Sequence, residues 1–469
     1  MGGLGVVSGT GLELVYPRLL QDGDPGGHVR RAFTELVRRQ PALSGPVWEL
    51  FDNYYIEGGR APGAPYKQVP ISRLARIENF RPGPDSFWEL PREMQVLVLA
   101  ANFAEVWLAR EGHDRPVGIN FLRKVERPLP WALYGAMLAG AAYVIVGAGS
   151  PDELPGMIRN LSRHEPAPMS FKVYGSRSDT GNFYAVARPG LLDCGGEPLP
   201  LPKFLAIVSS FGLAKELAGN PAARPYGFVV EGSEAGGHSA APAVMRFDGE
   251  GKPLLVYTDK DRADIGAIAG LGLPFWLAGA YASHPRLQAA RQLGAAGIQF
   301  GTLAALSSQS GLEPGLRSRT LKLLAAGELK VTNALVSPTG FPFKVAQVPG
   351  TVSEEAVYQG RKRRCDIGLL QTPYLKPDGS LGYRCPAEPV DAFVAKGGRA
   401  QNTAGRVCLC NALLAAAAVP QVQPGGYVEP AIVTLGEDLA SAKELISALP
   451  PGHETYTIGK ALKFLRGPA

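Results

Sequence analysis

Seven short runs of apolar residues recur before residue 303, and each leads into glycine or serine. The runs consist mostly of consecutive Val, Ile, Leu and Phe without polar alternation, which is typical of strands buried on both faces. Stretches with helical spacing lie between many of them, the clearest at 153–163, 213–218 and 285–293. Repeated strand–helix–strand units predict a parallel α/β fold. The runs cover residues 3–9, 116–121, 143–149, 204–210, 227–232, 274–280 and 297–302.

Seven parallel strands fit two architectures, a TIM-type barrel that lacks one strand or an open doubly wound sheet. In both architectures, active sites lie at the carboxyl ends of the strands. The Gly, Ser, Asn and Glu residues of the seven runs gather at those ends. We therefore expect the functional site along that edge of the sheet.

Three regions interrupt the strand–helix rhythm. Residues 11–115 run long without a clear core strand, which predicts a helical insertion. Residues 165–200 carry a predicted hairpin of 170–175 with 182–188. Beyond about residue 305 the pattern is mixed, and residues 435–449 have helical spacing. We therefore expect a barrel over residues 1–304, with the two insertions, and a C-terminal extension over 305–469 that packs on it.

The composition excludes several classes of protein. Hydrophobic residues make up 45% of the 469 positions and charged residues 19%, so the chain can bury a large core and is not disordered. The net charge of +6 is mild for this length and does not indicate a nucleic-acid-binding protein. The sharpest basic run, at 361–364, is expected to form a solvated surface patch, with an anion or partner site as the alternative.

No segment is expected to enter a membrane. The N-terminal residues lack the basic start and apolar run of a signal peptide. Two windows without charge, 128–151 and 265–285, are long enough for a span, but each divides into a helix-like half and a short strand-like half.

Five widely spaced cysteines do not suit a disulfide scaffold. We expect a cytoplasmic protein in a reducing compartment.

Four of the five cysteines fall in the C-terminal extension, at Cys365, Cys385, Cys408 and Cys410. Their spacings are wide, and the single residue between Cys408 and Cys410 is less than the gap of two to four in zinc knuckles. We predict no metal site and favour packing or redox roles, with a metal or iron–sulfur site as the alternative. Cys194 stands apart in a glycine-rich turn.

The most informative segment is VVEGSEAGGH at 229–238, where a buried strand ends and a tight loop begins. The adjacent Gly236 and Gly237 let backbone N–H groups converge on an anion, because no Cβ blocks the approach. His238 follows at the expected edge of the sheet, and histidine exchanges protons near neutral pH. The segment indicates an active-site loop; a histidine that merely caps the loop is the alternative.

The ends of the last two predicted strands carry small residues that could bind a phosphate group. LAGA at 277–280 contains Gly279, and GIQFGT at 297–302 ends in Gly301 and Thr302. In TIM barrels a phosphate commonly binds to the loops after the last two strands, and glycine amides with a hydroxyl suit a phosphate monoester. Asn120, at the end of the strand at 116–121, is placed to bond a flat heteroaromatic ring or to form an Asx turn.

Three common nucleotide and hydrolase motifs are missing from the sequence. No G-x-G-x-x-G fingerprint follows a strand, there is no P-loop lysine motif, and there is no G-x-S-x-G elbow. A nicotinamide-binding Rossmann domain, a P-loop NTPase and an α/β-hydrolase are therefore disfavoured.

These segments together resemble the nitronate monooxygenase (2-nitropropane dioxygenase-like) flavoproteins. EAGGH at 234–238, LAGA at 277–280 and GIQFGT at 297–302 resemble that family's flavin-site loops. GGLGVVSG at 2–9 and PVGINF at 116–121 resemble its second and third strands, and SPTGFPFK at 337–344 resembles a stretch after the barrel in its longer members. The resemblance covers most of residues 1–345, apart from the insertions.

The resemblance implies a TIM barrel that binds FMN without a covalent bond. His238 matches the family's active-site histidine, which takes an α-proton from a neutral nitroalkane; a nitronate needs no such base. Asn120 would lie near the flavin ring. The flavin would accept electrons from the substrate and pass them to oxygen. The residues that would hold the FMN phosphate are Gly236, Gly237, Gly279, Gly301 and Thr302.

The sequence departs from the family pattern in two places. The family opens with a further strand that carries flavin contacts and has no counterpart before residue 2. We expect an α/β fold of TIM (β/α)8 type whose first strand is either truly absent, leaving an incomplete barrel, or encoded upstream of the start codon at Met1. Members often have a second glycine where Ala280 stands, and the backbone amide remains available there.

Three functions remain open at this point. The leading one is an FMN-dependent oxidoreductase that oxidises nitronates or nitroalkanes with molecular oxygen. The second is a flavin-dependent enoyl reductase that acts on acyl chains and uses NAD(P)H. The third is a flavin-binding protein without turnover. The expected partners are a small nitronate or acyl-type substrate and oxygen, with a homo-oligomer as a further possibility and neither nucleic acid nor membrane.

Overall fold

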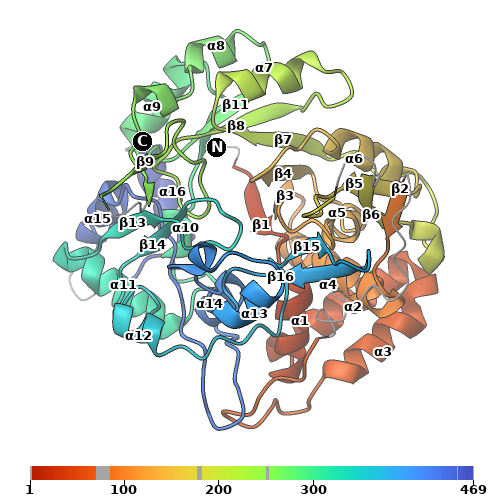
Figure 1. The fold of residues 1–469 in the computed structure, drawn as a ribbon. Coiled ribbons are helices and arrows are strands. Elements are labelled where there is room, and N and C mark those ends of the chain that lie inside the picture. The colour runs from red at the N-terminus through yellow and green to blue at the C-terminus, as the bar shows by residue number, and fades with distance from the viewer. Residues whose placement is uncertain (1–2, 70–84, 177–181, 250–252, 451–452, 468–469) are drawn as a thin grey trace.

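A parallel sheet with helices around it forms the centre of the computed structural model (Figure 1). The structure describes residues 3–69, 85–176, 182–249, 253–450 and 453–467. Seven strands follow one another in the order β1-β3-β4-β7-β8-β11-β12, and every neighbouring pair is parallel. The strands are β1 (Gly5–Ser8), β3 (Val117–Leu122), β4 (Tyr143–Gly147), β7 (Lys203–Val208), β8 (Gly227–Glu231), β11 (Phe275–Ala278) and β12 (Gly297–Gln299).

All seven apolar runs therefore form strands of one sheet, and the fold is of TIM type. A closed barrel of this type has eight parallel strands. Here β1 and β12 are the two edges, and each has a single partner strand among the described residues. This agrees with the expected barrel that lacks one strand.

Both faces of the sheet are covered, which explains the unbroken apolar runs. Ile119, Val144 and Phe228 belong to the large cluster that packs the sheet against the surrounding helices. Alternate residues such as Ile145 and Val229 form a second, smaller cluster on the inner face. Successive side chains on a strand point to opposite faces of the sheet. When both faces are buried, odd and even positions of each run therefore have to be apolar.

Helices follow the strands as the spacing predicted. They are α5 (Leu129–Leu138), α6 (Leu154–Ser162), α7 (Phe211–Gly219), α8 (Ile265–Ala269), α9 (His284–Gln292) and α10 (Thr302–Ala305). Both uncharged windows resolve into a helix and the strand after it, α5 with β4 and α8 with β11. Within the described parts of the chain, no helix is long and apolar enough to cross a membrane.

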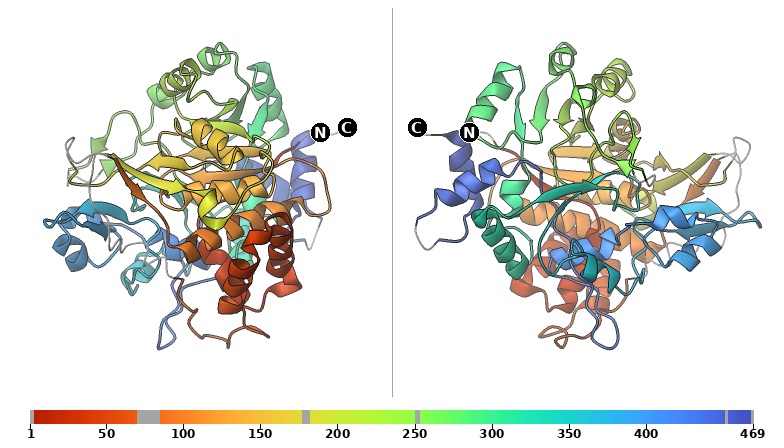
Figure 2. Two further views of the ribbon diagram at one scale, coloured as in Figure 1. Left: turned by 90° about the vertical axis from the view of Figure 1, so that its right-hand side faces the viewer. Right: turned by 60° about the vertical axis from the view of Figure 1, so that its left-hand side comes forward.

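The region between β1 and β3 is helical, as expected, and packs into the main core. Leu36 and Leu50 share one buried cluster with Ile119 of the sheet. These helices lie at the bottom of both views in Figure 2, opposite α7–α9. They are α1 (Leu12–Gln21), α2 (His28–Arg39), α3 (Ser44–Tyr54) and α4 (Arg92–Arg110).

The second interruption is a small mixed sheet. β5 (Ala167–Ser170) pairs antiparallel with β6 (Asn182–Ala187), and β2 (Asp85–Trp88) adds a parallel strand on the other side of β6. The sequence predicts this hairpin, but with its first strand at 170–175 instead of 167–170. The proline within 167–170 favoured a turn there. Residues 177–181 of the predicted hairpin lie outside the described residues.

The part beyond residue 305 mixes short helices and hairpins. The predicted helix over 435–449 is too long at its start: only Ala440–Ser447 is helical, because residues 434–437 cross the sheet's edge instead. The elements of this part are α11 (Pro314–Ala326), β13 (Val331–Ala334), β14 (Phe343–Ala346), α12 (Glu355–Gln359), β15 (Thr372–Leu375), β16 (Leu381–Arg384), α13 (Val390–Ala395), α14 (Leu409–Ala416), α15 (Ala440–Ser447) and α16 (Ile458–Arg466). A two-stranded hairpin of β9 (Arg246–Phe247) and β10 (Pro253–Leu254) precedes it, between β8 and α8.

The prediction of a solvated basic run at 361–364 is correct for Lys362 and Arg364, which are exposed, and wrong for Arg361, which is buried. The Arg361 side chain is 1% exposed and forms an ion pair of 2.8 Å with Glu429, whose side chain is also buried. Local charge density alone could not reveal this distant carboxylate.

We expect Gly135 to be required at the crossing of α4 and α5. A Cβ on Gly135 would clash with the backbone carbonyl of Leu99, whereas a Cβ on Gly45 of α3 would meet nothing within 4 Å. Gly135→Ala should lower the free energy of unfolding by about 1–3 kcal/mol through overpacking. Gly45→Ala should leave it equal or raise it by about 0.5–1 kcal/mol. Urea unfolding of both variants measures this, and equal stability of the two would contradict the packing account.

Candidate functional site

The carboxyl ends of β8, β11 and β12 are neighbours in the sheet and carry most of the predicted site residues. The loop after β8 contains Gly236, Gly237 and His238. Gly279 follows β11, and Gly301 and Thr302 follow β12. The structure thus brings these six residues to one edge of the sheet, as parallel strands require.

His238 is held between a hydroxyl group and an aromatic ring. Its Nε2 lies 2.7 Å from Ser337 Oγ, so the two atoms share a hydrogen bond. Its ring packs edge-on against Phe343, with centroids 4.9 Å apart. Burial lowers the pKa of His238 to about 4. The imidazole is therefore neutral at pH 7 and able to accept a proton, although it is a weak base.

A buried lysine and two carboxylates lie beside the histidine loop. Lys344 follows Phe343 in β14, is fully buried, and donates to Glu437 Oε1 at 2.6 Å. Glu231 ends β8 on the inner face, two residues after Val229. Burial raises the pKa of Glu231 to about 7, and the charge of Lys344 partly opposes this rise. Glu231 is thus poised to hold or release a proton near neutral pH.

Backbone amides at the ends of β11 and β12 are free to bind an anion. The N–H groups of Gly279, Ala280 and Gly301 have no acceptor among the described residues. Gly279 and Ala280 both have positive φ, 84° and 58°, which turns the chain sharply after the strand. The positive φ of Ala280 explains why glycine would suit this position.

The segment 434–437, which we call the rim segment, crosses the same loops. Gly237 N–H donates to Thr434 Oγ1 at 2.9 Å, and Gly436 N–H donates to Thr302 Oγ1 at 2.9 Å. The Gly237 amide is therefore engaged by the protein itself, while the Thr302 hydroxyl retains its proton for a further bond. Gly236 has to be glycine for this approach, because a Cβ there would lie 2.8 Å from the Gly436 nitrogen.

Asn120 lies apart from these residues, on β3, three strands from β8 in the sheet order. It alternates with Ile119 and Phe121 of the outer core and so faces the inner side. Its side-chain amide has no hydrogen-bond partner among the described residues. It is thus available to a ligand that lies across the inner face.

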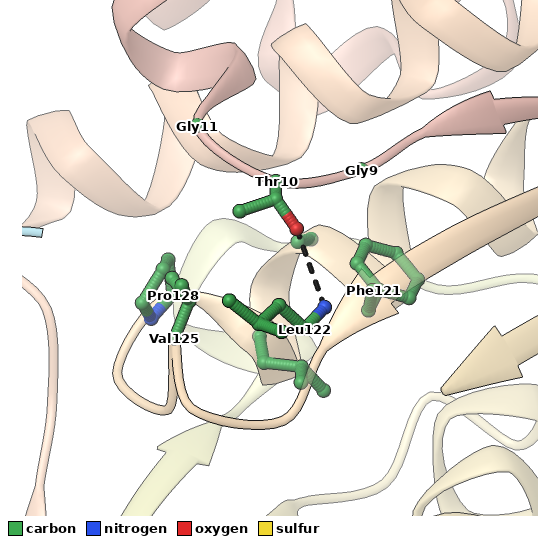
Figure 3. Close-up of a pocket in the computed structure, with 9 residues that line it drawn as sticks. Gly9, Thr10, Gly11, Phe121, Leu122, Val125 and Pro128 are labelled. Carbon is green, nitrogen blue, oxygen red and sulfur yellow. Dashed lines mark hydrogen bonds between the residues drawn. The ribbon is translucent and has the colours of Figure 1, made fainter. Parts of the chain in front are cut away.

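A small pocket opens beside β3 at the ends of β1 and β3 (Figure 3). Its wall includes Thr10, whose hydroxyl accepts from Leu122 N–H at 3.3 Å. The pocket has room for roughly one water molecule. This pocket is too small to be the binding site of a flavin.

Sequence reasoning missed four residues of the site. The only local signal for Glu231 is a carboxylate at the end of an otherwise apolar strand. Lys344 ends the segment SPTGFPFK at 337–344, for which the sequence indicates only a family resemblance. Ser337 lies in that stretch too, while nothing in the local sequence marked Glu437. These residues meet His238 or one another through contacts between segments about 90 residues or more apart in the chain.

No protein-family model matches the chain. Among curated proteins, it is 24% identical over 351 residues to the (3aS,4S,5R,7aS)-5-hydroxy-7a-methyl-1-oxo-octahydro-1H-indene-4-carboxyl-CoA dehydrogenase of Mycobacterium tuberculosis (strain ATCC 25618 / H37Rv). The match covers 69% of this chain and 91% of that protein. The chain is similar to this dehydrogenase over most of the latter's length.

Solved structures give weaker likenesses. The enoyl reductase domain of MlnA from Bacillus amyloliquefaciens matches with a TM-score of 0.41 and 10% identity, over 80% of this chain and 87% of that one. Nitroalkane oxidase from Streptomyces ansochromogenes matches with a TM-score of 0.36 and 18% identity, over 77% of this chain and 94% of that one. FabK from Thermotoga maritima matches with a TM-score of 0.35 and 19% identity, over 54% of this chain and 60% of that one, so the chain spans about three fifths of FabK. At these values no inference about activity follows.

We expect His238 to stay neutral far below the usual histidine range. Its pKa of about 4 predicts that its ring resonances shift near pH 4 rather than near 6.5. Because the unfolded chain takes up this proton first, His238 should cost the folded state stability as the pH falls from about 6.5 to 4. An NMR titration of the histidine rings, assigned with His238→Gln, measures the midpoint. A midpoint near 6.5 would refute the burial account.

Proposed function

We propose that this protein is a flavin-dependent oxidoreductase that binds FMN at the carboxyl ends of β11 and β12. The observation that carries the proposal is the group of acceptor-free amides of Gly279, Ala280 and Gly301 beside the Thr302 hydroxyl. Backbone amides that converge where glycines let a ligand approach closely are suited to a phosphate monoester. FMN ends in such a group.

The residues present fit this cofactor in two further respects. A Cβ added to Gly301 would meet nothing within 4 Å, so space is open beside its amide. The free side-chain amide of Asn120 faces the inner side of the sheet and could bond a flat heteroaromatic ring there. The bound flavin would supply hydride or electron transfer, and the protein would position the substrate.

The proton of the reaction would be handled by His238 and Glu231. His238 is neutral at pH 7 and can accept a proton from a carbon next to an electron-withdrawing group, while Ser337 fixes its ring. Glu231 has a pKa of about 7, which matches proton exchange at neutral pH better. Lys344 pairs with Glu437, and its proximity partly opposes the rise in the pKa of Glu231.

Two substrate classes fit this site. Nitronates and nitroalkanes follow from the resemblance of EAGGH and its neighbouring loops to nitronate monooxygenases, with oxygen as the electron acceptor. Acyl thioesters are favoured by the sequence similarity to a carboxyl-CoA dehydrogenase. Neutral nitroalkanes and acyl thioesters both have an acidic α-carbon, so the same base would serve either one, whereas a nitronate needs none.

Gly301→Glu should abolish flavin binding without unfolding the protein. The new carboxylate has room, and it would stand beside the phosphate and repel it. Gly219→Glu, at the end of α7 with equal open space, is the matched control and should bind FMN as the wild type does. Fluorescence titration with FMN measures both affinities. Stoichiometric FMN in Gly301→Glu would overturn the phosphate assignment.

His238→Ala should keep bound flavin and lose turnover of substrates that must be deprotonated. Neutral nitroalkanes or acyl thioesters should react about 10²–10⁴-fold more slowly, because a general base contributes on that scale. Nitronates should still react at close to the wild-type rate, which makes them the control within the same variant. Stopped-flow reduction of the flavin by each substrate measures this. Undiminished nitroalkane or thioester turnover would remove His238 from the role of base, and Glu231→Gln would then test the other candidate.

A further inference from the structure

The hydroxyl groups of Ser337 and Thr339, which we call the hydroxyl pair, form a short network on one nitrogen of His238. Ser337 Oγ lies 2.7 Å from His238 Nε2 and 2.7 Å from Thr339 Oγ1. The Thr339 N–H donates to the same Ser337 Oγ at 3.2 Å, and the Phe341 N–H donates to Thr339 Oγ1 at 3.3 Å. Two oxygens thus join the histidine loop to the segment 337–341.

Backbone groups hold both ends of this network in place. Ser239 N–H donates to the Pro342 carbonyl at 3.1 Å, which ties the residue after His238 to the segment that carries the hydroxyl pair. Arg406 Nη1 donates to the Ser337 carbonyl at 2.7 Å. The close approach of Ser337 Oγ to His238 Nε2 therefore rests on a fixed backbone framework.

A count of protons leaves two arrangements for the network. A serine hydroxyl has one proton to donate and two lone pairs that accept. The Thr339 N–H occupies one lone pair of Ser337 Oγ, so one of its other two neighbours donates to it and the remaining one accepts its proton. In the first arrangement, His238 Nε2–H donates to Ser337, which donates to Thr339. In the second, the Thr339 hydroxyl donates to Ser337, which donates to an unprotonated Nε2.

The two arrangements give His238 opposite chemistry. A neutral imidazole has one protonated and one unprotonated nitrogen. The first arrangement leaves Nδ1 unprotonated and able to accept a proton, whereas the second leaves an Nδ1–H that can only donate a hydrogen bond. Nδ1 has no hydrogen-bond partner among the described residues. Ser337 is completely buried while His238 is only partly buried, so Nε2 points into the protein and Nδ1 is the nitrogen left for a substrate.

The proton balance favours the arrangement with the proton on Nε2. The second arrangement would leave the Nδ1 proton without an acceptor in the described part of the chain, and an N–H without an acceptor is rarer in proteins than a lone pair without a donor. The first leaves only the Thr339 hydroxyl proton unassigned. Thr339 is partly exposed and precedes the exposed Gly340, so water can accept that proton.

We propose that Ser337 and Thr339 hold His238 as the tautomer with its proton on Nε2, and so make Nδ1 the nitrogen that takes the substrate proton. The α-proton moves to Nδ1, its electron pair stays on the substrate, and the imidazolium that forms still donates Nε2–H to Ser337. That bond then strengthens, because hydrogen bonds from charged donors are roughly twice as strong as neutral ones. Ser337 and Thr339 are positioning residues. Their part in turnover rests on the proposed function, but the tautomer itself does not.

Nitrogen NMR of the full chain with isotope-labelled histidine, without substrate, measures the tautomer. The chain has six histidines, and His238→Gln identifies the signals of His238. At pH 7 its Nε2 shift should be that of a protonated nitrogen and its Nδ1 shift that of an unprotonated one. The reverse assignment would overturn the proposal. The expected tautomer in a protein without oxidoreductase activity would refute the proposed function alone.

Thr339→Val tests the hydroxyl pair. Valine has nearly the shape of threonine but cannot accept the Ser337 proton, so Ser337 should donate to His238 Nε2 and the Nδ1–H tautomer should become populated. Turnover of neutral nitroalkanes or acyl thioesters should fall about 10-fold if the active tautomer falls to about a tenth of the population. Nitronates should react at the wild-type rate. Thr339→Ser, which restores the hydroxyl, should restore both the tautomer and the rate.

Thr332→Val is the matched control, because Thr332 is an exposed threonine of β13 outside this network. It should show the wild-type tautomer and rates. An unchanged tautomer in Thr339→Val would overturn the role of the hydroxyl pair. An equal loss of rate with nitronates and nitroalkanes would mark a general structural effect and contradict it too. Should Thr339→Val fail to fold, the shifts of the wild type still test the proposal, because a protonated Nδ1 would exclude it.

Discussion

The structure depends on the parallel hydrogen-bonded ladder from β1 to β12. Parallel strands have to be connected by crossovers, and the crossovers here place helices against the outer face. The same ladder aligns all carboxyl ends on one edge. Because both faces of the sheet are buried, its polar side chains gather at that edge. Glu231 and Asn120 lie there and face the inner side of the sheet.

The rim segment, residues 434–437, crosses this edge and is bonded to its loops. Thr434 and Gly436 bond directly to the loops after β8 and β12, and Glu437 binds the buried Lys344. Because Lys344 follows Phe343, the same contact also holds the ring that packs on His238. The part beyond residue 305 therefore supplies groups to the site rather than merely covering the barrel.

Much of the fold and part of the site could be predicted from local sequence. The seven strands and the helices after them follow from runs and spacings a few residues long, and so did the placement of Gly279, Gly301 and His238 at strand ends. What failed rests on distant partners. The ion pair of Arg361 with Glu429 and the bond of Lys344 with Glu437 join segments that no local pattern relates.

The central claim is that the edge formed by β11 and β12 holds FMN. The most direct measurement is a denaturing release of cofactor from the purified full chain, with chromatography and mass spectrometry of the released compound and a visible spectrum before release. The account predicts about one FMN per chain. A protein without flavin that also fails to bind added FMN would contradict it.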